Sequence, residues 1–514
     1  MKSFFRRFLF EGDILRLMGL FALAKPLGLV VQMLLAYYFG AGEHFDAYAL
    51  AIFIISYTGS IVGRVFTSVV VPYTISLRKT LDEYSVFGFQ NAVVLLFAIP
   101  SGVATLFLAF RGDLIIDLIG ADLPETTRGY AIDMVRAMAL PGMILLQIAM
   151  LKAILNLNER FKFATAMPLV NAVVMLAAIV LFQGRFGIWS VLLGFAASNL
   201  VQVVGLGWYV IRHHCIAWVR PSLPSGSLAK IWSLSWMMLV SQSIVTLYHF
   251  VDKMFAAGLP AGSISTITYS MTIVNFGVQV FSLTLIMVMF TRMSQMMSER
   301  RIDDLNEYVR DNLGRVTRIV VPASLIVSLA APEVVRILYQ RGEFSPEDSV
   351  KTAAAMSIYL LGLPGLITNN IVTRIFHSMQ RMREKIYLAI QYLATNVIGN
   401  MILIGHLGVP GLAISTVVTV NIHLFLSFWV LHRYGMGFEI RKFVTIILHH
   451  YIIAAIVVGA YFLFDVAGQV GQMIDTTSLL GAFGIASLKA MFVLVLYGLL
   501  YLASKFLVPP GKRV

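Results

Sequence analysis

The stretch LRLMGLFALAKPLGLVVQMLLAYYFG, residues 15 to 40, is long and apolar enough to cross a membrane as one helix. It nevertheless contains a lysine, Lys25, followed directly by a proline, Pro26. An ionisable residue at membrane depth is rare and costly, so it marks a functional position by default. The stretch therefore predicts a membrane protein and raises the question of why a charge is tolerated there.

Comparable apolar runs continue along the chain, whose 514 residues are 59% hydrophobic and only 13% charged, with a mean hydropathy of +0.83. So few charges cannot cover the surface of a soluble protein of this size. We therefore expect an all-α polytopic membrane protein with about 14 transmembrane helices. They lie near residues 15–40, 47–77, 90–110, 130–155, 163–183, 187–211, 231–257, 264–291, 316–340, 349–376, 385–404, 408–432, 443–465 and 481–504.

The loops between these helices alternate in charge. NERFK at 158, SERR at 298 and QRMREK at 380 are basic, whereas AGEHFD at 41 and GHLGVPG at 405 lie on the opposite side. The positive-inside rule makes the basic side cytoplasmic and places both termini in the cytoplasm. The net charge of +13 then reflects topology and lipid contact, and nucleic acid is not an expected partner.

Five residues recur at one fixed spacing and indicate an internal repeat. Arg160, Gly184, Gly187, Trp208 and Arg212 reappear 221 residues later as Arg381, Gly405, Gly408, Trp429 and Arg433. Each unit then holds six helices and enters the membrane in the same orientation, a plan typical of transporters. We expect one six-helix bundle over 1–230, a second, pseudo-twofold-related bundle over 231–442, and two extra helices over 443–514.

Lys25 and Arg64 lie in the two arms of the first predicted hairpin. At about 1.5 Å per residue, both fall roughly 22 to 26 Å from its outer end. Two cations at one level predict the wall of a wet, electropositive cavity, although either could instead snorkel to the cytoplasmic face or pair with an acid. Pro26 and Gly28 would loosen the helix and free carbonyl groups, which is tolerated where backbone lines a cavity.

Asp252 and Lys253 form a second charged position, near the outer end of the predicted helix 231–257. Adjacent residues on a helix do not face each other, so a simple ion pair between them is not expected. Asp252 could hold a cation or a proton, or it could merely lie at the wet interface. Lys489, in the last predicted helix, has no evident role.

The motifs of several enzyme classes are missing from the sequence. It contains no P-loop of the form GxxxxGK[ST], no HExxH and no GxSxG elbow. Its single cysteine, Cys215, excludes an intrachain disulfide and a cysteine metal cluster. A transporter without a bound metal is therefore favoured over a membrane enzyme such as a saccharide polymerase, which would need catalytic residues in large outer loops.

Three stretches resemble the MurJ/MviN family of lipid II flippases, part of the multidrug/oligosaccharidyl-lipid/polysaccharide exporter superfamily. They are FGAGEHFDAYALA at 39–51, ILNLNERFKFATAMPLVN at 154–171 and APEVVRILYQRGEFSPEDS at 331–349. The resemblance implies alternating access between two six-helix bundles. It also implies a polyprenyl diphosphate with a sugar or muropeptide head as substrate, and a place in the bacterial inner membrane beside the glycosyltransferases or polymerases of cell-wall synthesis.

The resemblance further implies a cationic cavity, for which Lys25, Arg64, Asp46 and Lys253 are the candidate substrate-binding residues. Lys25 stands where the family has an arginine, and Asp46 matches the acid after FGAG. Asp252 is the candidate ligand of a coupling monovalent cation or proton, and no other cofactor is expected. Because further family arginines are missing here, a lipid-linked exopolysaccharide or O-antigen unit is the alternative substrate.

Overall fold

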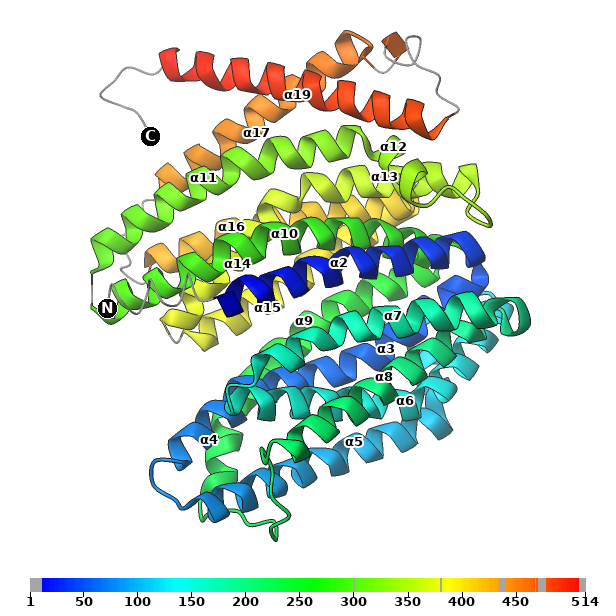
Figure 1. Cartoon of the computed structure of the whole chain (residues 1–514). Coiled ribbons are helices and arrows are strands. Elements are labelled where there is room, and N and C mark those ends of the chain that lie inside the picture. Colours follow the sequence, from blue (N-terminus) through cyan, green and yellow to red (C-terminus); the bar gives the residue numbers. More distant parts are fainter. Residues whose placement is uncertain are drawn as a thin grey trace. The chain divides into compact units, whose positions relative to one another are not determined.

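The computed structural model describes residues 12–299, 301–379, 381–433, 440–466, 468–469 and 478–507. Within these ranges the regular elements are helices, as Figure 1 shows. The first half contains α2 (Gly12–Phe39), α3 (Glu43–Val65), the π-helical η1 (Phe66–Val70), α4 (Val71–Leu77), α5 (Glu83–Ile119), α6 (Glu125–Leu157), α7 (Phe161–Phe186) and α8 (Trp189–Arg212). The chain continues with α9 (Ser227–Ala257), α10 (Ser263–Ser298), α11 (Ile302–Leu329), α12 (Ala331–Leu338), α13 (Pro346–Leu361), α14 (Leu363–Ser378), α15 (Met382–Leu407), α16 (Val409–Arg433), α17 (Ile440–Leu463) and α19 (Leu479–Leu507). The predicted all-α class is confirmed.

The predicted membrane spans all fall on helices. Among the described residues, 9 helices are long and apolar enough to cross a membrane, namely α5, α6, α7, α8, α11, α15, α16, α17 and α19. The pair α13 and α14, bent by 45° at a short break, makes a tenth. The four remaining predicted spans coincide with the helices α2, α3, α9 and α10.

Two further predicted spans are divided into shorter elements. The span 47–77 divides into α3, η1 and α4, and 316–340 divides into α11 and α12. Both α4 and α12 begin with a proline at their first or second position. Proline suits the first turn of a helix because its missing N–H would have no partner there. The new helices start at Val71 and at Ala331, each one residue before its proline.

The chain forms two compact units, each with its own core. Unit 1 comprises Met1–Thr246 and Pro260–Ser265, and unit 2 comprises Leu247–Leu259 and Thr266–Val514. This division cuts through α9 and α10, so it does not test the domain boundaries predicted at residues 230 and 442.

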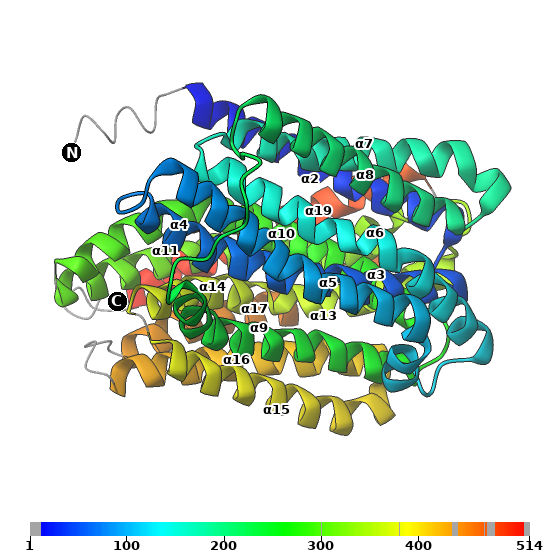
Figure 2. The same ribbon diagram turned by 90° about the horizontal axis from the view of Figure 1, so that it is seen from below.

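The internal repeat is visible in the backbone of two helical hairpins. The bounds of α7 and α15 lie 221 residues apart at both ends. Gly187, which ends α7, has φ 53° and ψ −134°, and Gly408, which ends α15, has φ 60° and ψ −134°. Positive φ favours glycine, which explains its recurrence. In each hairpin the two helices lie side by side, α7 with α8 and α15 with α16 (Figure 2).

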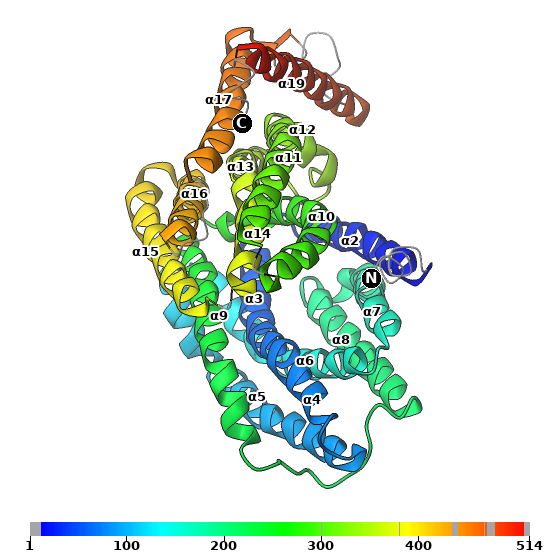
Figure 3. The same cartoon turned by 90° about the vertical axis from the view of Figure 1, so that its left-hand side faces the viewer.

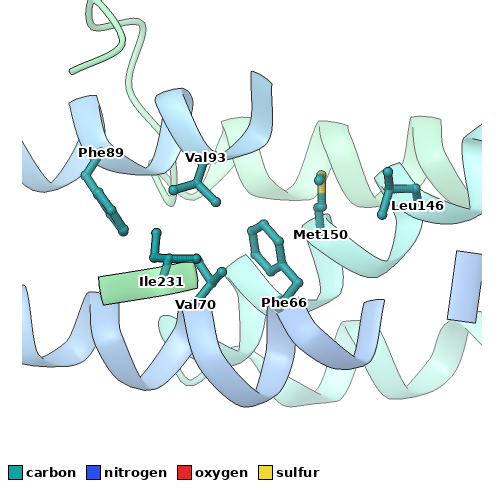
Figure 4. Packing of buried hydrophobic residues seen from close by; sticks show 8 residues of the cluster. Phe66, Val70, Phe89, Val93, Leu146, Met150 and Ile231 are labelled. Carbon is teal, nitrogen blue, oxygen red and sulfur yellow. The ribbon is translucent and has the colours of Figure 1, made fainter. Parts of the chain in front are cut away.

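The core of unit 1 gathers large apolar side chains from several helices. In Figure 4, Phe66 and Val70 of η1 lie opposite Phe89 and Val93 of α5, with Met150 of α6 beside them. Between membrane helices such packing supplies much of the association energy, because lipid tails are as apolar as the side chains themselves.

The two C-terminal helices pack on the rest of unit 2. Figure 3 shows α17 and α19 beside α11, and the contact buries Leu325 of α11, Val457 of α17 and Val493 of α19. The two helices predicted as extra to the repeat are therefore joined to this unit by an apolar core of their own.

Candidate functional site

Lys25 lies in α2 with an exposed side chain. It makes no hydrogen bond or ion pair to any residue that the structure describes. The helix continues through Pro26, and a Cβ added at Gly28 would meet nothing within 4 Å. Within the described residues, the Lys25 side chain is thus exposed and the space beside Gly28 is empty, and their place in a cavity stays a prediction. Arg64 has its backbone in α3, but its side chain lies outside the described residues, so its pairing with Lys25 stays a prediction.

Asp46 occupies a different environment, since its side chain is buried in the first turn of α3. Its carboxylate accepts hydrogen bonds from the backbone N–H of Gly262 at 2.6 Å, from that of Ser265 at 2.6 Å, and from the Ser265 hydroxyl. These donors belong to the start of α10, where the first N–H groups of a helix have no partner within it. Asp46 thus acts as a helix cap, and its role in substrate binding stays a prediction.

Gly262 allows this cap to form. Its φ is +88°, and a Cβ there would lie 2.4 Å from the carbonyl oxygen of Ala41. Any larger residue would therefore separate the turn at Ala41 from the start of α10 and move the two N–H groups away from Asp46. The acid and the glycine form one structural unit, although the chain separates them by more than 200 residues.

Asp252 and Lys253 do not pair with each other, as predicted. The Lys253 ammonium donates to the Thr268 hydroxyl at 2.9 Å, between α9 and α10. Asp252 instead accepts a hydrogen bond of 2.9 Å from the side-chain amide of Asn400, in α15. Neighbours in sequence thus contact different helices.

Asp252 belongs to a polar cluster within unit 2. Asn396, one turn before Asn400, accepts a hydrogen bond of 3.2 Å from the side-chain amide of Asn400. Tyr248 lies beside Asp252, with its ring packed edge-on against Tyr392 at 4.8 Å. In the part of the chain that the structure describes, the side-chain oxygen of Asn400 is buried and has no hydrogen-bond partner. A carboxylate beside an unsatisfied amide oxygen is an oxygen donor set of the kind that hard cations prefer.

The structure explains Lys489. Its ammonium lies 2.8 and 3.0 Å from the two carboxylate oxygens of Glu333, in α12, and 3.1 Å from the carbonyl oxygen of Leu329, in α11. The ring of Tyr461, in α17, lies 5.8 Å from the charge. Lys489 therefore joins α19 to three other helices of unit 2.

Three polar residues escaped the sequence reasoning. Asn400 is the partner of Asp252 and Asn396 is the partner of Asn400, and the spacing of one turn between the two asparagines within an apolar run was a visible signal. Lys152, half-buried in α6, has no hydrogen-bond or ion-pair partner among the described residues. Its signal was a lysine within a predicted span.

Comparison with known proteins gives one consistent family. The family model described as Lipid II flippase MurJ matches residues 35–477. The probable lipid II flippase MurJ of Vibrio cholerae serotype O1 is 24% identical over 88% of this chain and 89% of its own. The lipid II flippase MurJ of Burkholderia cenocepacia is 21% identical over 95% of this chain and 96% of its own.

Solved structures agree on the fold. The inward closed conformation of a lipid II flippase MurJ superposes with a TM-score of 0.78 at 19% identity, covering 94% of this chain and 97% of that one. An inward-facing multidrug transporter of the MATE family superposes with a TM-score of 0.67 at 13% identity, covering 82% of this chain and 96% of that one. Likeness at such low identity concerns the helical fold alone.

Proposed function

Because this chain belongs to the MurJ family of lipid II flippases, we propose that it moves a lipid II-like polyprenyl diphosphate precursor across the bacterial inner membrane. The observation that carries the proposal is the family match over residues 35–477, which includes nearly every described helix. The protein is accordingly a multi-pass transporter and not an enzyme. It works by alternating access, beside the glycosyltransferases or polymerases that make and use its substrate.

The direction of transport follows from the charge of the loops. The basic loops put both termini in the cytoplasm, so the substrate enters from the cytoplasmic leaflet and leaves in the outer leaflet. A diphosphate is anionic, and the cell interior is negative. Outward movement of an anion is then favoured by about 2.3 kcal/mol per charge per 100 mV.

Lys25 is the proposed first contact of the diphosphate. It is a cation at membrane depth with an exposed side chain and no ion-pair partner among the described residues. A hydrogen bond between an ammonium and a phosphate is charge-assisted, which makes it stronger than a neutral one. Arg64 is the proposed second cation of unit 1, and Lys253, held by Thr268, is the proposed cation of unit 2. Asp46 positions the start of α10.

Asp252 is the proposed coupling residue. Its carboxylate and the unsatisfied side-chain oxygen of Asn400 offer oxygen ligands to a monovalent cation, or a binding place for a proton. Cluster members on α9 and α15 would each gain a contact when the ion binds. Binding of the ion would therefore favour one arrangement of these helices over another.

Transport in reconstituted vesicles tests the proposal. The purified full chain is placed in liposomes that contain lipid II, and the lipid II exposed on each leaflet is measured after a membrane potential is applied. We expect redistribution of lipid II that depends on the protein. A chain that redistributes a lipid-linked exopolysaccharide unit but leaves lipid II in place would contradict the proposed substrate.

A further inference from the structure

A pocket of about 420 Å³ lies in unit 2 between α15 and α16, two helices that pack side by side (Figure 2). It has no part in the proposed transport site. A glutamate and an arginine, Glu384 and Arg433, lie at its rim. Two aromatic residues, Tyr387 and Trp429, form its sides. The remainder is lined by the apolar Leu388, Leu426 and Val430 and by Gln391, whose amide nitrogen donates to the Thr395 hydroxyl.

The lining changes from charged to apolar along the helix axes. Glu384 lies in the first turn of α15, and Arg433 is the last residue of α16, so both charges stand at the same end of the hairpin. Leu426 lies seven residues before Arg433, about 10 Å deeper at 1.5 Å per residue. Ile422 and Phe425, 40% and 50% exposed, continue the apolar surface. A polar mouth above an apolar wall suits an amphiphile that lies along the helices.

Glu384 and Arg433 do not pair with each other, and each can form a further hydrogen bond or ion pair. The Glu384 side chain is only 13% exposed. Among the described residues, Arg381 is its one ion-pair partner, with the guanidinium 3.3 Å from one carboxylate oxygen. Arg433 lies over the ring of Trp429 at 5.5 Å and forms no ion pair with any described carboxylate. The pocket thus offers the Glu384 carboxylate, which can accept a further hydrogen bond, and the Arg433 guanidinium, which can bind an anion.

The first repeat shows that the fold alone does not create this pocket. Residues 221 positions earlier keep the tryptophan and the arginine, as Trp208 and Arg212. The position equivalent to Glu384 is Phe163, whose ring stacks on Tyr209 at 4.2 Å and reaches the site of a Cβ at Gly205, the equivalent of Leu426. An aromatic ring thus fills the place that is polar in the second repeat. The carboxylate is a feature of the second hairpin.

We propose that this pocket binds a phospholipid with a zwitterionic head bearing a primary ammonium, phosphatidylethanolamine, in the leaflet at the basic end of the hairpin. The ammonium donates to Glu384, the phosphate accepts from Arg433, and an acyl chain lies along Leu426. The anionic phosphatidylglycerol headgroup would offer Glu384 only neutral hydroxyl donors, whose hydrogen bonds to a carboxylate are weaker than those of an ammonium. A choline headgroup has no N–H, and Arg433 already covers a face of the Trp429 ring.

Native mass spectrometry of the full chain in detergent tests the proposal. The protein is titrated with phosphatidylethanolamine, phosphatidylcholine and phosphatidylglycerol that carry identical acyl chains. We expect phosphatidylethanolamine to bind most tightly. Glu384→Gln should lower its affinity roughly 10- to 100-fold, the effect of one charged hydrogen bond, and bring it to the level of phosphatidylcholine. Arg433→Gln should weaken all three lipids, whereas Arg212→Gln, at the equivalent position, should change none of these preferences.

A variant that keeps both charges gives an independent reading. Leu426→Trp fills the apolar part of the pocket and should abolish tight binding of phosphatidylethanolamine while Glu384 stays in place. Equal binding of the ethanolamine and choline lipids to the native protein would overturn the proposal. Preferred binding of phosphatidylglycerol, or an ethanolamine preference that survives both Glu384→Gln and Leu426→Trp, would overturn it as well. Because the readout is binding of a bilayer lipid, the result does not depend on transport.

Discussion

Lys25 and Asp46 are ionisable residues of the first two helices, and their surroundings are opposite. Asp46 is buried and accepts three hydrogen bonds, so its charge is already used to hold the start of α10. Lys25 is exposed and has no hydrogen-bond or ion-pair partner within the described ranges. A charge with partners stabilises a fold, whereas a charge at membrane depth without one is available to a ligand.

Replacement of Lys25 tests its role as the contact of the diphosphate. Lys25→Met should lower the rate of lipid II transport roughly 10- to 100-fold, because it removes a charge-assisted hydrogen bond. Lys25→Arg keeps the cation and should retain most of the rate. Lys79→Met removes an exposed lysine after α4 and is the control. Wild-type transport by Lys25→Met would rule out this contact.

Replacement of Asp252 tests ion coupling. Asp252→Asn keeps the size of the side chain but removes its charge, so the stimulation of transport by a sodium or proton gradient should fall by about 5- to 150-fold, the range of typical coupling energies. Transport rates are measured in vesicles with each gradient imposed separately. Asp133→Asn, which changes an exposed acid of α6, should leave the stimulation intact. An unchanged gradient dependence in Asp252→Asn would exclude it as the coupling residue.

The sequence was sufficient to single out the charged residues but not their partners. Lys25 and Asp252 stand out because an ionisable residue in an apolar run is a local feature. The partner of Asp252 is 148 residues away, and that of Lys489 is 156 residues away. Such pairs depend on how helices pack, and a single sequence without aligned relatives holds no record of that. Glu333 and Asn400 were therefore unforeseen.

At the scale of helices, a buried ion pair attaches the C-terminal helix α19 to α12. The Lys489 and Glu333 side chains are only 6% and 13% exposed, and they connect α19 with α12. The apolar contacts among α11, α17 and α19 are not specific for one register, because lipid tails could replace them. The ion pair fixes that register, since a slip of one turn would leave both charges buried and unpaired.

Disruption of this pair has a predictable cost. Lys489→Met or Glu333→Gln should each lower the free energy of unfolding by about 3 to 5 kcal/mol, because the remaining charge stays buried. The double variant Lys489→Met with Glu333→Leu should regain most of the lost free energy of unfolding, because neither charge then remains buried. Unfolding is followed by thermal denaturation in detergent. Lys351→Met, which breaks the exposed pair with Glu347, should cost at most about 1 kcal/mol, and an equal cost at both sites would contradict the assignment.

Helix breaks were partly foreseeable from the sequence. Pro72 and Pro332 lie at the starts of α4 and α12, within two predicted spans. Proline in the first turn of a helix is a local sequence signal, but the prediction by apolar runs did not use it. The π-helical turn η1 had no comparable signal. The hairpins α7 with α8 and α15 with α16 were foreseeable from the repeated glycines Gly187 and Gly408, which occupy the same backbone conformation.

At the scale of the whole chain, apolar runs, basic loops and a repeat agree with the family match over residues 35–477. These properties are distributed along the sequence, which is why the fold class and the transporter class could be predicted. The substrate depends on a few side chains, and the proposed first contact, Lys25, lies before the residues that the family model matches. A phosphate tolerates a lysine or an arginine, although only arginine binds it through two parallel hydrogen bonds.

The most direct test of the central claim is complementation of a bacterial strain depleted of its own lipid II flippase. The full chain is expressed in that strain, its presence in the membrane is verified, and growth is measured after depletion. We predict that the native chain restores growth and that Lys25→Met, at equal expression, does not. Lysis of cells that contain the native chain in their inner membrane would contradict the claim that it transports lipid II.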